Sequence, residues 1–156
     1  MKKSWALEMQ KIILDTNVVV SSLISKNYPY FIVKRCIEKK LQICLSDSVF
    51  REYKEVLARP KFVKFPDFRD NANFLLLKLS AIAVFYNPTK KLRIIRDVPD
   101  NRILELAQAS TADFLITGNT NDFTMPNFEE TRITTPSEYW TKFRTRNELI
   151  FNPKVF

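Results

Sequence analysis

Short apolar segments alternate with longer segments of helical spacing, and this alternation constrains the fold more than any other feature of the chain. Strands are predicted at 11–15, 42–45, 114–117 and 132–134, with at least one more within 84–86 and 92–95. Helices are predicted at 16–24, from Pro29, at 47–58, 67–82 and 98–109, and from Pro136 to Phe143. Short apolar strands that alternate with such helices form a parallel sheet covered on both faces. We therefore predict an α/β fold.

Length and composition predict a single domain spanning residues 1–156, with a core at about 11–145 and a loosely attached tail at 146–156. Hydrophobic residues make up 46% of the chain and charged residues 27%, as in soluble globular proteins. The longest apolar run is 81–86, whereas a transmembrane helix needs about 20 residues. No signal-peptide core follows Lys2 and Lys3, so we expect a cytoplasmic protein without a membrane partner.

Two absences limit the chemistry. The chain has no histidine, which excludes Ser-His triads, His-ligated zinc and His acid–base catalysis. Its single glycine, Gly118, excludes a P-loop and a dinucleotide-binding glycine loop. An enzyme of this composition works with carboxylates, hydroxyls, thiols, lysines or a metal held by oxygen atoms.

Acids stand where α/β proteins place their chemistry, at the carboxyl ends of strands. Asp15 directly follows a buried strand, where a carboxylate is costly unless it is paired, hydrogen-bonded or metal-bound. Capping of the next helix is the alternative role for Asp15. Asp100 falls on the buried face of a helix in its first turn, whereas Glu105 is predicted to point away. Asp97 is predicted to cap this helix, in a supporting position.

Helix geometry separates two glutamates on the segment 47–58. At about 100° per residue, Glu52 lies about 40° beyond the edge of the apolar face, and Glu55 lies opposite that face. We predict that Glu52 borders buried surface and that Glu55 faces water. A flanking helical charge is the alternative interpretation of Glu52.

The segment 117–123 follows another buried strand and holds the only glycine. A glycine at a strand end permits a positive φ angle or a close backbone approach. Asn119 and Asp122 are predicted to lie at the same edge as Asp15, and Asp113, which precedes the strand, at the opposite edge. An ordinary turn explains the Asn and Gly residues equally well.

Four acids from four segments are thus predicted to converge on one edge of the sheet. They are Asp15, Glu52, Asp100 and Asp122. Such acids repel one another unless they are neutralised, and a hard cation such as Mg²⁺ or Mn²⁺ commonly bridges carboxylates to a substrate phosphate.

The chain is basic, with 25 Lys and Arg against 17 Asp and Glu and a net charge of +8. The basic residues predicted to hold nucleic acid are Arg59, Lys61, Lys64, Lys90, Lys91, Arg93 and Arg96. A field of this sign attracts polyanions, although lysines also simply solubilise helix surfaces. An acidic metal site in a basic environment suits cleavage of a nucleic-acid backbone.

Four motifs stand in order along residues 11–140. They are ILDTNV at 13–18, Glu52 with VLARPKF at 56–62, DVPDN at 97–101, and ADFLITGN at 112–119 with Asp122-Phe123. Together they resemble the PIN-domain family, in its toxin-like VapC-type branch. The resemblance implies a three-layer α/β/α fold and a Mg²⁺- or Mn²⁺-dependent endoribonuclease that hydrolyses RNA phosphodiester bonds. It also implies a homodimer and inhibition by a small cognate antitoxin.

Carried over by position, Asp15, Glu52, Asp100 and Asp122 are the catalytic and metal-binding acids. The supporting residues are Thr16, Asn17, Asp97, Thr117 and Asn119. Many PIN domains carry an acid directly after Thr-Gly, where this chain has Asn119; related branches carry it at the position of Asp122.

Two other functions compete with this one. Asn119 favours a catalytically weak PIN-fold module that binds RNA. A phosphatase with a strand-end Asp nucleophile is disfavoured, because Asn17 stands where its second acid belongs.

Overall fold

A six-stranded sheet forms the centre of the computed structural model, which describes residues 9–145. The strands are β1 (Lys11–Leu14), β2 (Gln42–Leu45), β3 (Val84–Phe85), β4 (Phe114–Ile116), β5 (Asn127–Phe128) and β6 (Thr131–Thr134). Their order is β3-β2-β1-β4-β6-β5, and every pair is parallel except β5 with β6. The predicted mostly parallel sheet is confirmed, although the short edge strand β5 was not predicted and residues 92–95 form no strand.

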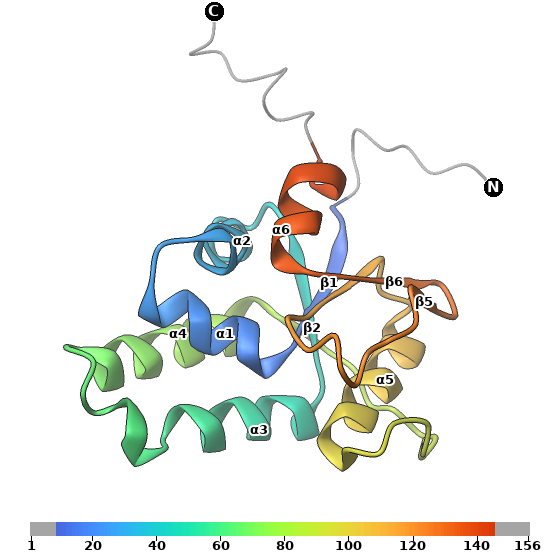
Figure 1. Cartoon of the computed structure of the whole chain (residues 1–156), viewed down its shortest axis with the longest axis horizontal. Helices are drawn as coiled ribbons and strands as arrows, with labels where there is room; N and C mark the ends of the chain where they lie inside the picture. Colours follow the sequence, from blue (N-terminus) through green and yellow to red (C-terminus); the bar gives the residue numbers. More distant parts are fainter. Residues whose placement is uncertain (1–8, 146–156) are drawn as a thin grey trace, which may run out of the picture.

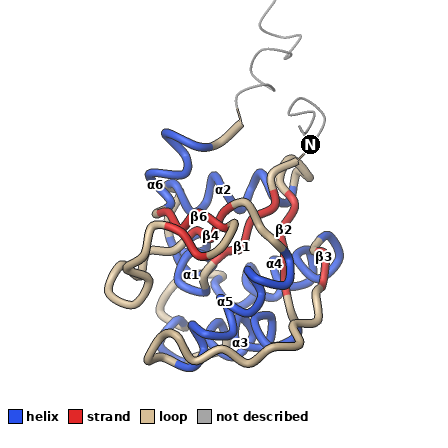
Figure 2. The backbone as a smooth tube through the Cα atoms, turned by 90° about the vertical axis from the view of Figure 1, so that its right-hand side faces the viewer, coloured by secondary structure: helices blue, strands red, loops and turns tan. Residues whose placement is uncertain are grey.

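The helices follow the predicted order closely. They are α1 (Thr16–Ile24), α2 (Tyr28–Ile37), α3 (Asp47–Leu57), α4 (Phe68–Ile82), α5 (Val98–Ser110) and α6 (Pro136–Glu138). A 3₁₀ turn, Pro60–Phe62, follows α3, and a π-helical turn, Tyr139–Phe143, continues α6. Helices α1, α2 and α4 lie on one side of the strands and α5 on the other (Figure 1). Figure 2, turned by 90°, shows the strands next to one another across the view, from the side that α5 covers.

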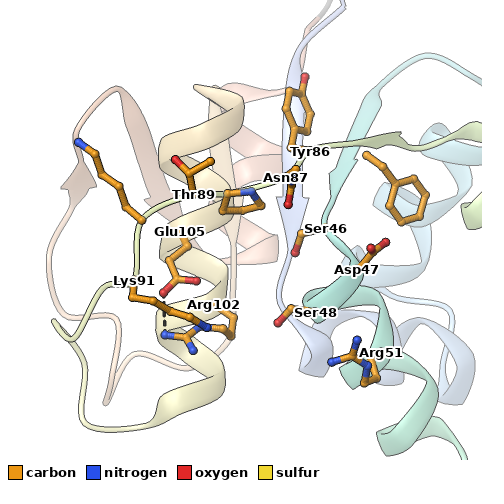
Figure 3. Close-up of a pocket in the computed structure, with 13 residues that line it drawn as sticks. Ser46, Asp47, Ser48, Arg51, Tyr86, Asn87, Thr89, Lys91, Arg102 and Glu105 are labelled. Carbon is orange, nitrogen blue, oxygen red and sulfur yellow. Dashed lines mark ion pairs between the residues drawn. The ribbon is translucent and has the colours of Figure 1, made fainter.

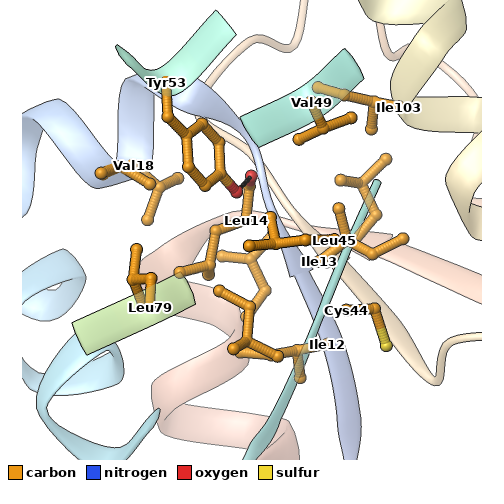
Figure 4. Close-up of a cluster of buried hydrophobic side chains, with 14 of the residues drawn as sticks. Ile12, Ile13, Leu14, Val18, Cys44, Leu45, Val49, Tyr53, Leu79 and Ile103 are labelled. Atoms are coloured by element: carbon orange, nitrogen blue, oxygen red, sulfur yellow. Dashed lines mark hydrogen bonds between the residues drawn. The ribbon is translucent and has the colours of Figure 1, made fainter. Parts of the chain in front are cut away.

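The central strands are buried on both faces, as a parallel sheet requires. Ile12, Ile13 and Leu14 of β1 are fully buried among Leu45, Leu79 and other apolar side chains (Figure 4). Their continuous apolar run explains why β1 occupies the middle of the sheet.

Local sequence fixes where the helices begin. The Ser46 hydroxyl accepts a hydrogen bond from the Val49 N–H at 3.2 Å, and the Thr135 hydroxyl accepts one from the Glu138 N–H at 3.1 Å. These are ordinary N-caps, and each places a helix start directly after a strand. The first turns of α3 and α6, like that of α1 directly after β1, therefore lie at the carboxyl edge of the sheet, and α3 also contacts α5.

Among residues 9–145, no helix is long and apolar enough to cross a membrane. The predicted tail, 146–156, lies outside the described residues.

Candidate metal centre

Asp15 lies at the junction of β1 and α1 and is only 4% exposed. Its Oδ1 accepts a hydrogen bond from the Thr16 N–H at 2.8 Å, and its Oδ2 accepts one from the Thr117 hydroxyl at 2.6 Å. Residue 117 is adjacent because β1 and β4 pair in register, with Leu14 opposite Ile116. Asp15 therefore caps α1, and each of its oxygens keeps a lone pair for a further ligand.

Glu52 reaches the same edge from α3. It is half-buried and accepts a short hydrogen bond from the Thr16 hydroxyl, whereas Glu55 is exposed. The predicted difference between the two glutamates is confirmed. Thr16 thus connects two acids, with its backbone on Asp15 and its hydroxyl on Glu52.

Tyr53, next to Glu52, fixes the depth of α3 against the sheet. Its fully buried hydroxyl donates a short hydrogen bond to the Leu14 carbonyl, one residue before Asp15 (Figure 4). Burial raises the pKa of the Tyr53 phenol well above its usual range, so the phenol keeps its proton and donates. The sequence analysis did not identify Tyr53 as a positioning residue.

Three further carboxylates, from Asp97, Asp100 and Asp122, gather beside these two. Each offers an oxygen atom within 4.8 Å of the others. Asp100 is buried in the first turn of α5, Asp122 is half-buried in the turn after β4, and Asp97 is exposed. Asp97 occupies the N-cap position of α5, yet its side chain accepts no capping hydrogen bond. Its carboxylate lies with the other acids, more directly in the site than the supporting position that sequence reasoning gave it.

Asn119 joins two of these acids. Its amide nitrogen donates to Asp122 Oδ2 at 3.1 Å and lies 3.4 Å from Asp100 Oδ2, while its carbonyl oxygen accepts from the Asp122 N–H at 3.2 Å. The Asn119 N–H also donates to the Thr117 hydroxyl at 2.9 Å, and that hydroxyl donates to Asp15. An amide at position 119 therefore links carboxylates that an acid there would repel.

Burial and, after it, neighbouring acids raise the pKa values of Asp15 and Asp100. Burial raises the pKa of Asp15, and the charges of Glu52 and Asp97 add to that effect against the opposing hydrogen bonds from Thr117 and Thr16. The pKa of Asp100 is raised to about 8, first by burial and then by the Asp15 charge, with further contributions from Asp122 and Asp97. The edge thus carries more negative charge than its surroundings neutralise.

Two details of the sequence analysis are wrong. Glu105 does not point away into water; it is only 5% exposed, accepts the Leu92 N–H at 2.8 Å and pairs with Arg102 at 2.6 Å. Gly118 has no positive φ, and a Cβ built there meets no atom within 4 Å, so neither proposed reason for a glycine applies.

The remaining predicted residues lie around the site or on the surface. Thr117 is buried and Asn17 is exposed. The seven predicted nucleic-acid-binding residues are all exposed; Lys61 and Lys64 rest over the rings of Phe62 and Phe65. Exposure keeps all seven accessible to a polyanion.

Comparisons with known proteins identify the family. The PIN domain family model matches residues 11–121. An uncharacterized protein of Methanocaldococcus jannaschii is 28% identical over 142 residues, which cover 85% of this chain and 91% of that protein. A similar fold occurs in a chain of the crystal structure of VapBC2 from Rickettsia felis bound to a promoter DNA fragment. The two chains have a TM-score of 0.53 and 19% sequence identity, and the match covers 80% of this chain and 98% of that chain. The structural likeness shows a shared fold, and because the family model spans most of the sequence, the chain belongs to the PIN-domain family.

Proposed function

We propose that this protein is a divalent-metal-dependent endoribonuclease and the toxin component of a type II toxin–antitoxin pair. The observation that carries the proposal is the convergence of carboxylates from β1, α3, α5 and the turn after β4 on one sheet edge of a PIN-family chain. PIN domains are generally nucleases, so the chemistry expected of the family and the donor set of this edge agree.

The residues at the edge fit Mg²⁺ or Mn²⁺. Their ligand atoms are carboxylate oxygens, which hard divalent cations prefer. Burial, and after it the charges of neighbouring carboxylates, raise the pKa values of Asp15 and Asp100, and a bound cation would offset both effects. Asp15, Glu52, Asp100 and Asp122 would hold the metal, with the Asp97 carboxylate beside them. When bound, the metal would activate a water molecule and stabilise charge on the scissile phosphate.

The chain's own residues orient this donor set. Thr117 and the Thr16 N–H fix both oxygens of Asp15, the Thr16 hydroxyl fixes Glu52, and Asn119 fixes Asp122. Such supporting hydrogen bonds hold ligands in a productive orientation before substrate arrives. The exposed basic residues add affinity for the RNA backbone and little sequence specificity.

A small antitoxin and a second copy of the chain are the proposed protein partners. The VapBC2 fold neighbour supports the antitoxin. An apolar pocket of about 410 Å³ between α1, α2 and α4 supports a protein contact, since the Phe74 side chain that lines it is 59% exposed. Large exposed apolar side chains beside a groove commonly mark protein contacts.

RNA cleavage by the purified chain tests the proposal. A labelled single-stranded RNA should be cleaved with Mn²⁺ or Mg²⁺, and cleavage should stop with EDTA and in Asp100→Asn. Persistent cleavage in EDTA, or in a folded Asp100→Asn variant at the wild-type rate, contradicts the proposed site.

A catalytically weak RNA-binding module is the second candidate, and Asn119 is the observation that favours it. Isothermal titration of Mn²⁺ into Asp122→Asn and Asn119→Asp separates the two functions. The nuclease predicts weaker Mn²⁺ binding in Asp122→Asn and retained or tighter binding in Asn119→Asp, because a carboxylate neutralises the cation and an amide does not. Binding of RNA without Mn²⁺ binding or cleavage supports the module.

A further inference from the structure

A second pocket, of about 350 Å³, lies beside the acidic edge and carries the opposite charge (Figure 3). It is formed by the start of α3, the segment after β3 and one face of α5. Four basic side chains from these three segments line it, and we call it the cationic pocket: Arg51, Lys90, Lys91 and Arg102. Sequence reasoning singled out the two lysines but neither arginine.

The charge of the cationic pocket stays positive after its acids are counted. Two acids, Asp47 and Glu105, also line it, so four positive charges less two negative charges leave an excess of two. Glu105 is already engaged, by Arg102 at 2.6 Å and by the Leu92 N–H at 2.8 Å. The Arg51, Lys90 and Lys91 side chains are exposed and accessible to an incoming anion.

The two lysines are carried by a segment that is anchored on both sides. The Tyr86 N–H donates to the Leu45 carbonyl at 2.8 Å, and beyond the lysines the Leu92 N–H donates to Glu105. The Asn101 side chain then accepts the Ile94 and Ile95 N–H groups at 2.9 and 2.8 Å. Lys90 and Lys91 therefore stand in a fixed position relative to α5 and to the start of α3.

The cationic pocket adjoins the candidate metal centre. Ser48, Arg51 and Arg102 also line a smaller pocket of about 250 Å³, which includes Glu52. A strand held at the acidic edge can therefore continue past Glu52 along this shared wall into the cationic pocket. Phe85, 42% exposed, also lines the cationic pocket, and an exposed aromatic ring is a surface on which a base can stack.

We propose that the cationic pocket is a positioning subsite that binds a backbone phosphate of the RNA strand outside the scissile bond. Arg51, Lys90 and Lys91 bind the phosphate, and Arg102 holds the wall through its ion pair with Glu105. The inference rests on the proposed ribonuclease function, because it takes the acidic edge as the place of cleavage. The subsite predicts that the RNA strand leaves the acidic edge in the direction of the cationic pocket.

RNA binding without cleavage tests the subsite. The probe is a fluorescein-labelled 12-nucleotide single-stranded RNA, measured by anisotropy in EDTA with the full chain. Lys90→Gln/Lys91→Gln should raise the Kd roughly 5- to 20-fold. The plot of the logarithm of the binding constant against the logarithm of the salt concentration should also become less steep, by about 1. The matched control, Lys39→Gln/Lys40→Gln, removes the same charge from two adjacent exposed residues that line none of the three pockets described above, and it should change the Kd less than twofold.

Each other outcome is decisive. Equal weakening by both pairs means that net charge alone acts, and this overturns the subsite, as does no weakening by either pair. Adenosine monophosphate that binds the wild type as tightly as the RNA does, and loses that binding in Lys90→Gln/Lys91→Gln, also overturns it in favour of a mononucleotide site. If the wild type fails to cleave RNA with Mn²⁺ but the binding difference persists, the ribonuclease function is wrong, and the cationic pocket is an RNA-phosphate site with no role in positioning a scissile bond. Thermal melting of each variant confirms that it is folded.

Discussion

The two edges of the sheet treat their carboxylates in opposite ways. At the amino edge, Asp113 stands just before β4, and its Oδ2 accepts the Lys11 N–H at 2.8 Å. At the carboxyl edge, Asp15 is held by equally good hydrogen bonds, yet burial and, after it, the converging charges of Glu52 and Asp97 raise its pKa. Hydrogen bonding satisfies one acid at each edge, but only the carboxyl edge retains charge that a cation would neutralise. The same residue type is therefore structural at one edge and a candidate ligand at the other.

The largest expected effect comes from removing one charge at each edge. Asp15→Asn should lose more cleavage than the roughly 10- to 100-fold typical of a residue that only supports a metal ligand. Its fold should persist, since Asn is also a good N-cap. Asp113→Asn should cleave RNA at the wild-type rate. Mn²⁺-dependent turnover of both variants is the measurement, and similar losses in the two would erase the distinction between the edges.

The second-largest expected effect is a difference in activity between substitutions of two glutamates on α3. Glu52→Gln should lower activity and Mn²⁺ affinity by more than the roughly 10- to 100-fold typical of a residue that only supports a ligand, because an amide keeps the Thr16 hydrogen bond but loses the charge. Glu55→Gln, on an exposed residue of the same helix, should change neither quantity. Titration calorimetry with Mn²⁺ and cleavage rates, measured in parallel on both variants, test this difference. A comparable loss in both variants would mean that the total charge of the helix, rather than the position of the glutamate, determines activity.

Local rules recovered most of this arrangement from the sequence. The strand-end position identified Asp15, and helical projection separated Glu52 from Glu55, because both depend only on a few neighbouring residues. The exposure of Asp97 was not predictable in this way. Its missing cap hydrogen bond and its approach to Asp122 depend on the turn after β4, which is 25 residues away in sequence.

Long-range backbone contacts account for what was missed. Glu105 is buried because the Leu92 N–H, in a segment without regular structure, needs an acceptor and finds that carboxylate. The Tyr53 hydroxyl contacts a carbonyl on β1 for the same kind of reason. Sequence periodicity predicts neither contact, because each depends on which distant segment packs against the helix: the segment with Leu92 against α5, and β1 against α3.

A smaller expected effect is on the pH dependence of folding stability in the absence of metal. The folded-state pKa of Asp100, about 8, is above its unfolded value, so its contribution to stability is full below the unfolded pKa and is lost as pH rises toward 8. The surrounding groups are the carboxylates of Asp15, Asp97 and Asp122 and the Asn119 amide. In EDTA, the melting temperature should therefore fall from pH 5.5 to 8.

The absence of histidine simplifies this measurement, because ordinary Asp and Glu side chains are already ionised at pH 5.5. Asp15, whose pKa is also raised by burial, contributes to stability with the same sign as Asp100. Saturating Mn²⁺ should flatten or reverse the slope, since the cation binds the ionised acids. Asp100→Asn should reduce the slope of melting temperature against pH in EDTA. Scanning fluorimetry across the pH series suffices, and a flat wild-type profile in EDTA would show that the carboxyl edge holds no more charge than the amino edge.

The smallest effect tests whether the only glycine serves the fold or the chemistry of the carboxyl edge. Gly118 has no left-handed φ, and a Cβ would meet no atom within 4 Å. Gly118→Ala should therefore raise the free energy of unfolding by about 0.4–1 kcal/mol, by restricting the unfolded chain. Urea denaturation measures that change, and a loss of stability would mean that the turn holding Asn119 and Asp122 needs a conformation closed to alanine. Cleavage should stay within about twofold of wild type, because the hydrogen bonds of Asn119 involve its own side chain and N–H. A stable variant that no longer cleaves RNA would instead place the substrate backbone in the open space beside Gly118.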